Sequence, residues 1–213
     1  MTNHDTLIEE LCRSATPVRR PLPVVLRTAS VATLSLALGW LAVHPRLSTA
    51  NLNGAGDLWG MLELALTGIA GVAALLCAFE ISIAGRQARG LRLAVGSLLA
   101  WLAVSLIGIF SSGAPHGSLG DGLYCFVFLL AVSTPMMVTV VFALRRTRAL
   151  QPRQALFMAG LSIAALSLSL LAFCHPFAPQ LIDFSMHLAA AACIVSLMVL
   201  LGRRWIEIPA GKT

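Results

Sequence analysis

Six long apolar runs, separated by short polar segments, make up most of the chain. They occupy residues 24–43, 58–83, 91–110, 123–144, 155–174 and 181–201. Each run is close to the roughly 20 residues that an α-helix needs to cross a bilayer. The segments between them are rich in Gly, Pro, Ser and Asn, and none is long enough to form a domain. The pattern therefore predicts an all-α fold, an integral membrane bundle of six transmembrane helices.

Composition excludes an ordinary soluble domain. Of the 213 residues, 58% are hydrophobic and only 11% are charged, whereas soluble domains carry about 25% charged residues. The predicted organisation is a polar tail at 1–22, a membrane domain at 23–203 and a second tail at 204–213. No convincing small-residue cleavage site follows the first apolar run, which therefore predicts a transmembrane helix rather than a signal peptide.

The basic residues are distributed very unevenly between the two sides of the predicted bundle. Fourteen of the 15 lie in the N-terminal tail and first span entry, the second and fourth polar segments and the C-terminus; the other three segments hold only Arg46. Lys and Arg near span ends stay in the cytoplasm, so both termini are predicted to be cytoplasmic. The net charge of +6 comes from these flanking arginines and forms no basic domain or motif, so direct binding of nucleic acid is not expected.

The N-terminal tail is the only long hydrophilic segment, and its pattern predicts a short amphipathic helix that ends before Pro17. Thr6 and Glu9 fit a capping box at its start. The apolar side chains that share one stripe are Leu7, Ile8 and Leu11. A helix of about three turns is marginal alone, so it needs a surface to bind. That surface is either membrane lipid, which the pattern alone favours, or a partner protein.

Glu63 and Glu80 are acidic residues inside the second apolar run. A carboxylate within a membrane span is by default a functional hypothesis, so a small transporter or accessory membrane subunit is the alternative function. Both residues are near span ends, where they can reach water or pair with arginine, Glu80 with Arg86 for example. Transport typically uses groups near the midplane, so this alternative is the weaker one. No nucleophile, phosphate-binding or zinc-protease motif is present, and the chain is not expected to be an enzyme.

Small residues recur four positions apart within two of the predicted spans. They are Ala70, Ala74 and Ala78 in the second span, and Gly160 and Ala164 in the fifth. This spacing places them on one face of each helix and allows the helices to approach closely.

Two of the five cysteines lie at the predicted outer face, since Cys125 begins the fourth run and Cys174 ends the fifth. His175 follows directly, and Asp183 and His187 lie one turn apart at the start of the last span. Thiols and imidazoles of this kind bind soft metal ions, and two thiols form a disulfide in an oxidising compartment. The third interpretation is that both cysteines pack as small apolar residues. Without a recognisable metal-ligand spacing, the pattern alone favours packing.

Several segments together resemble a known family, the NrsF-type negative regulators of an extracytoplasmic-function sigma factor. These segments are the tail LIEELCRSATPVRRP before the first of six spans, the run from Cys125 to Arg145 and Arg146, and the final span after Cys174, which ends in LLGRRW. Proteins of this family are membrane anti-sigma factors of proteobacteria. The resemblance covers essentially the whole chain.

The resemblance implies an anchor in the bacterial inner membrane that keeps a sigma factor away from RNA polymerase until an external stress releases it. Two family cysteines implicated in sensing heavy-metal or oxidative stress match Cys125 and Cys174, in agreement with their predicted outer-face position. The tentative metal ligands are these two thiols with His175 and His187. No permanently bound cofactor is expected, only a regulatory heavy-metal ion, and metal ligation and disulfide formation both stay open. Our own inference places sigma-factor binding in the tail, at Leu7, Ile8, Leu11, Arg19 and Arg20.

Overall fold

Every regular element that the structure describes is an α-helix. The computed structural model describes residues 3–14, 22–47, 58–83, 85–112, 119–146, 151–173 and 180–206. The helices are α1 (Asn3–Ser14), α2 (Val24–Leu47), α3 (Leu58–Ile81), α4 (Gly90–Ser112), α5 (Leu119–Arg145), α6 (Pro152–Leu171) and α7 (Leu181–Ile206). Six of them, α2 to α7, are long and apolar enough to cross a membrane. The predicted all-α fold is confirmed, and each of the six predicted runs forms a helix long and apolar enough to span a membrane.

The long helices follow the predicted runs but differ at their ends. Helix α2 continues to Leu47 rather than residue 43, and α5 begins at Leu119 rather than 123. A helix satisfies its own backbone hydrogen bonds, so it can continue past the apolar core of the bilayer into the polar interface. Hydrophobicity therefore marks where a span must be helical and not where the helix stops.

Helix α1 corrects one detail of the predicted tail. It is already helical at Asn3, so Thr6 lies inside the helix and does not act as its N-cap. The expected capping box with Glu9 is therefore wrong. The acidic residue in the first turn is Asp5, whose charge favours the positive end of the helix dipole. The helix ends at Ser14, before Pro17, as predicted.

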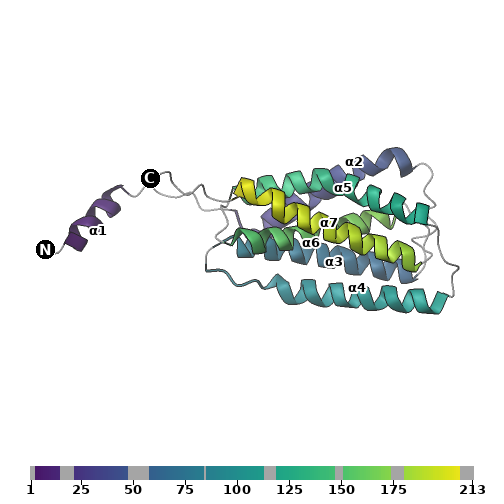
Figure 1. Ribbon diagram of the computed structural model, residues 1–213. Coiled ribbons are helices and arrows are strands. Elements are labelled where there is room, and N and C mark those ends of the chain that lie inside the picture. Colours follow the sequence, from purple (N-terminus) through teal and green to yellow (C-terminus); the bar gives the residue numbers. More distant parts are fainter. Residues whose placement is uncertain are drawn as a thin grey trace.

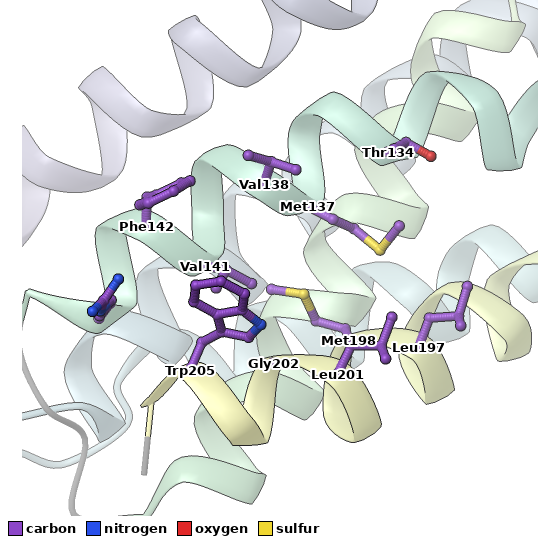
Figure 2. A pocket seen from close by; sticks show the side chains of 11 residues that line it. Thr134, Met137, Val138, Val141, Phe142, Leu197, Met198, Leu201, Gly202 and Trp205 are labelled. Atoms are coloured by element: carbon purple, nitrogen blue, oxygen red, sulfur yellow. The ribbon is translucent and has the colours of Figure 1, made fainter. Parts of the chain in front are cut away.

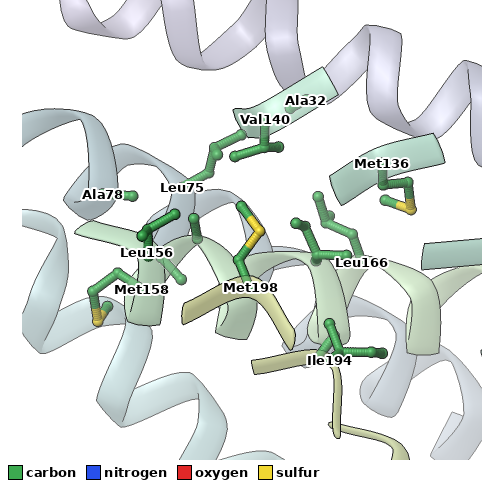
Figure 3. Close-up of a cluster of buried hydrophobic side chains, with 14 of the residues drawn as sticks. Ala32, Leu75, Ala78, Met136, Val140, Leu156, Met158, Leu166, Ile194 and Met198 are labelled. Atoms are coloured by element: carbon green, nitrogen blue, oxygen red, sulfur yellow. The ribbon is translucent and has the colours of Figure 1, made fainter. Parts of the chain in front are cut away.

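Helices α2 to α7 form one bundle, and α1 lies apart from it (Figure 1). Helix α6 is central, since 78% of the residues in its most apolar stretch are buried inside the protein, compared with 56% for α3. Helix α6 packs on α3, α5 and α7. Helix α4 packs mainly against α3. All six long helices contribute to the core, α4 through Ala94, and Figure 3 shows part of it. It contains Ala32 of α2, Leu75 and Ala78 of α3, Met136 and Val140 of α5, Leu156 and Leu166 of α6, and Ile194 and Met198 of α7.

The small residues predicted to allow close approach are buried in this core. Ala70, Ala74 and Ala78 are at most 1% exposed on α3. A Cβ added to Gly160 of α6 would lie 2.9 Å from the Cα of Val195 in α7. The backbones of α6 and α7 are therefore in near contact at this point, which only glycine permits.

Contacts between helix ends place the starts of α2, α4 and α6 beside the ends of α3, α5 and α7. The residue pairs that make these contacts are Arg27 and Ala143, Glu80 and Gly90, and Leu156 and Gly202. The arginines described in the bundle gather at this end: Arg27, Arg86, Arg89, Arg92, Arg145, Arg146, Arg153, Arg203 and Arg204. Among the described residues of the opposite end, only Arg46 is basic. We call the first of these the arginine-rich end and the second the opposite end.

Candidate functional site

The apolar stripe predicted on the tail helix is exposed. Leu7, Ile8 and Leu11 on α1 are 54%, 58% and 61% exposed, and residues 4–14 are all exposed. The bundle therefore does not cover this stripe, which presents three large apolar side chains for a further contact. Arg19 and Arg20, predicted to contribute to the same surface, lie outside the described residues.

Arg27, one of the basic residues at the entry of the first span, connects three helices at the arginine-rich end. It lies in the first turns of α2, and its guanidinium donates a hydrogen bond to the backbone carbonyl of Ala143 near the end of α5. The same group lies 4.3 Å from the ring centroid of Phe79 in α3, within the range of a cation–π interaction. The helix that follows the tail is thus attached to α5 and α3 through one side chain.

At the opposite end, the start of α5 packs directly on the start of α7. A Cβ added to Gly122 would lie 3.0 Å from Met186 Cγ and 3.7 Å from Asp183 Oδ1. Cys125 follows one turn later on the same side of α5, and it is 1% exposed. His187 is one turn beyond Asp183 on α7, and it is half-buried. Cys125 and His187 therefore lie along the facing sides of these two helices.

The structure places only part of the predicted sensor. Cys174 and His175 lie outside the described residues, so their relation to Cys125 stays a prediction. Among the described residues, no group of three or more His, Cys, Asp or Glu side chains is arranged to hold a metal ion. Phe173, at the end of the described α6 segment, packs edge-on against Trp40 of α2 with 6.0 Å between ring centroids.

The two intramembrane glutamates both make hydrogen bonds that join α3 to α4. Glu63 accepts a hydrogen bond from the Ser105 hydroxyl at 3.1 Å, near the opposite end. Glu80 accepts one from the backbone N–H of Gly90 at 3.3 Å, and so caps the first turn of α4. The predicted ion pair between Glu80 and Arg86, both of which the structure describes, is not formed. These contacts give both carboxylates a structural role and weaken the case for transport.

A groove at the arginine-rich half of the bundle runs between α5 and α7 (Figure 2). Its volume is about 300 Å³. Met137 and Val141 of α5 and Leu197 of α7 point into it, and Trp205 lies at one end (Figure 2). The groove cannot be predicted from the sequence, because the residues that line it look like ordinary apolar residues of two spans.

The comparisons with known proteins agree with the resemblance noted in the sequence. The family model of NrsF, described as "Negative regulator of sigma F", matches residues 11–207. The match includes all six long helices and Leu11, and it begins after Leu7 and Ile8. No curated protein and no solved structure matches the chain.

Proposed function

The chain belongs to the NrsF family of negative regulators of sigma F, and we propose that it sequesters an extracytoplasmic-function sigma factor at the bacterial inner membrane. As a member of this family it is a non-enzymatic regulator, and its six spans make it a multi-pass membrane protein. In the proposal the arginine-rich end and both termini face the cytoplasm, because basic residues near span ends resist translocation. The observation that carries the proposal is the family match across residues 11–207.

Helix α1 is the element that binds the sigma factor in this proposal. Its 12 residues are too few for a helix that is stable alone, and its apolar stripe is exposed on Leu7, Ile8 and Leu11. Docking this stripe into a groove of the partner would bury the three side chains and order the helix at once, as amphipathic helices do in other complexes. Arg19 and Arg20 would add contacts to acidic groups of the sigma factor.

Cys125 and Cys174 sense heavy-metal ions or oxidants in this proposal. Cys125 is supported by its burial at the contact between α5 and α7, where a new bond to sulfur would disturb packing. His187 on α7 and His175 are the tentative additional ligands. A soft metal ion would supply the cross-link in one case, and a disulfide between the two thiols in the other.

Helix α5 connects the proposed sensor to the tail. It carries Cys125 near one end and Ala143 near the other, and the carbonyl of Ala143 accepts a hydrogen bond from Arg27 of α2. A displacement of α5 therefore acts on the helix that follows the tail. A differential affinity of about 1.4 kcal/mol between two states of the bundle changes sigma-factor binding about tenfold.

The test is a pull-down of purified extracytoplasmic-function sigma factors of the same organism, using the full chain solubilised in detergent. Deleting residues 1–22, or changing Leu7, Ile8 and Leu11 together to serine, should abolish capture. Glu9→Gln is the matched control, since Glu9 lies on the face of α1 opposite the stripe, and it should capture normally.

The pull-down separates two failures. Capture by the truncated chain would move the binding surface to the arginine-rich loops at 85–92 and 145–154 while keeping the function. If the intact chain, with its helical content verified by circular dichroism, captured no sigma factor, the proposed function would be wrong.

A further inference from the structure

The groove between α5 and α7 is almost entirely apolar along its length. Among the described residues that line it, Thr134 and Arg145 are the only ones with strongly hydrophilic side chains. Several of the lining side chains lie open to the surroundings: Val138 is 51% exposed and Leu201 is 57% exposed. Both lie within spans, so these side chains face hydrocarbon rather than water. An occupant of the groove must therefore itself be apolar over most of its length.

The length of the groove corresponds to one leaflet of the bilayer. Thr134 and Arg145 mark its two ends on α5, and eleven residues of α-helix rise by about 16 Å. The hydrocarbon core is about 30 Å thick, so the groove extends from the interface at the arginine-rich end to about the midplane. A single acyl chain of a phospholipid fills such a space.

The interfacial end of the groove is cationic. The guanidinium of Arg145 lies 5.8 Å from the ring centroid of Trp205, which holds it near the mouth. Arg146 follows in sequence and is exposed, and Arg203 and Arg204 are exposed on the last turn of α7. None of the described residues that line the groove is acidic. Arginine matches the geometry of a phosphate group through its planar fork of donors, so the mouth is complementary to an anionic headgroup.

The charge at the mouth argues against a second copy of the chain as the occupant. A two-fold symmetric contact through this groove would bring the same surface of both copies together. It would place Arg145 near its own counterpart, and the described residues that line the groove include no carboxylate to neutralise this pair.

We propose that the α5–α7 groove is a binding site for an anionic phospholipid, with one acyl chain against Met137, Val141 and Leu197 and its phosphate at Arg145. This site is separate from the tail and from the cysteines, and it requires no sigma factor. Zwitterionic phospholipids enter the same groove more weakly, because their headgroup lacks the net charge that Arg145 attracts.

The experiment is native mass spectrometry of the full chain released from detergent in the presence of phosphatidylglycerol or phosphatidylcholine with identical acyl chains. The intact protein should bind one phosphatidylglycerol with several-fold preference. Arg145→Gln should lower the affinity for phosphatidylglycerol by roughly fivefold, because one arginine contributes about this much to binding anionic lipid. Affinity for phosphatidylcholine should change little.

Two further variants make the test specific. Arg153→Gln is the matched control, since Arg153 is exposed at the same end of the bundle on α6 and does not line the groove. It should bind phosphatidylglycerol normally. Val141→Phe fills the groove and should weaken both lipids.

Three results would overturn the site. The first is that the intact chain binds the two lipids with equal affinity. The second is that Arg145→Gln and Arg153→Gln lose affinity for phosphatidylglycerol equally. The third is that the chain forms a dimer without bound lipid, and that Val141→Phe converts this dimer to monomer. The second of these would show attraction to the general surface charge, and the third would identify another copy of the chain as the occupant.

Discussion

At the scale of single residues, glycine decides how closely the helices pack. Gly160 brings α6 within near contact of the α7 backbone at Val195, and Gly122 of α5 leaves room for the side chains of Ile182 and Met186 at the start of α7. Close approach of this kind maximises van der Waals contact, which drives association where the surrounding lipid is as apolar as the side chains. The spacing of Gly160 and Ala164 indicated such a contact from sequence, but it could not indicate the partner helix.

Gly160→Ala should destabilise the bundle. The added Cβ would lie 2.9 Å from the Val195 Cα and 3.3 Å from the Met198 Cβ, and backbone cannot move aside as a flexible side chain can. Overpacking of this kind typically costs about 1–3 kcal/mol. Thermal unfolding in detergent, followed by circular dichroism, should show a lower transition temperature.

Gly96→Ala is the matched control for this substitution. Gly96 lies within α4, and a Cβ there would meet nothing within 4 Å. Alanine is the better helix former by about 1 kcal/mol, so the transition temperature should stay the same or rise. Equal destabilisation by both variants would contradict the packing argument at Gly160.

At the scale of helices, the sequence predicted where each span lies but not what holds the spans together. Apolar runs of about 20 residues report a requirement of the bilayer, and this requirement is local to each helix. The contacts of Arg27 with α3 and α5 depend on which helices become neighbours, which no periodicity of α2 encodes. In the sequence, Arg27 is only one more positive charge at the entry of a span.

Arg27→Met should weaken the junction of α2, α3 and α5. The substitution keeps an apolar stem of similar length, but it removes the cation–π contact with Phe79 and the hydrogen bond to Ala143. The combined loss should be about 2 kcal/mol, measured as a lower thermal transition. Under the proposed function, it should also reduce metal-triggered release of the sigma factor while leaving capture intact.

Arg92→Met provides the comparison for the junction. Arg92 is exposed in the first turn of α4 at the same end of the bundle, so its replacement removes an equal charge without breaking a contact between helices. It should unfold at the temperature of the unmodified chain. Stability unchanged in Arg27→Met would mean that the junction does not hold these helices.

At the scale of the whole molecule, one end of the bundle carries the arginines and the other carries Cys125. The sequence predicted this separation from the alternation of basic residues between spans, and the contacts between helix ends agree with it. The predicted pairing of Cys125 with Cys174 involves a residue outside the described part of the chain. The tail helix was predicted because its stripe repeats with a helical period, whereas its start was misplaced because several polar residues near it can cap a helix.

Replacing both Cys125 and Cys174 by serine should separate sensing from binding. Capture of the sigma factor should be unchanged, because the proposed binding surface is on α1. Release by heavy-metal ions or oxidant should be lost. Serine can return its hydroxyl hydrogen bond to the preceding turn of a helix, so the buried position at 125 should tolerate it. The measurement is the amount of sigma factor eluted from immobilised protein as the metal concentration rises.

The control for the cysteine pair is Cys193→Ser, a half-buried thiol in the middle of α7. It should release the sigma factor like the unmodified protein. Normal release by the double variant would reject the sensing proposal and leave the anti-sigma function standing.

The attachment of α4 has a consequence for how the bundle assembles. This helix packs mainly on α3, and polar contacts join it there near both ends, through Glu63 with Ser105 and Glu80 with Gly90. Helices inserted independently associate afterwards within the bilayer, so α4, which contacts mainly α3, can join after the other five have packed together. By the same reasoning it can leave first, as a local opening that exposes the α3–α4 contact and leaves the remaining bundle intact. Quality-control proteases of the membrane would then encounter α4 as the first element released from a destabilised chain.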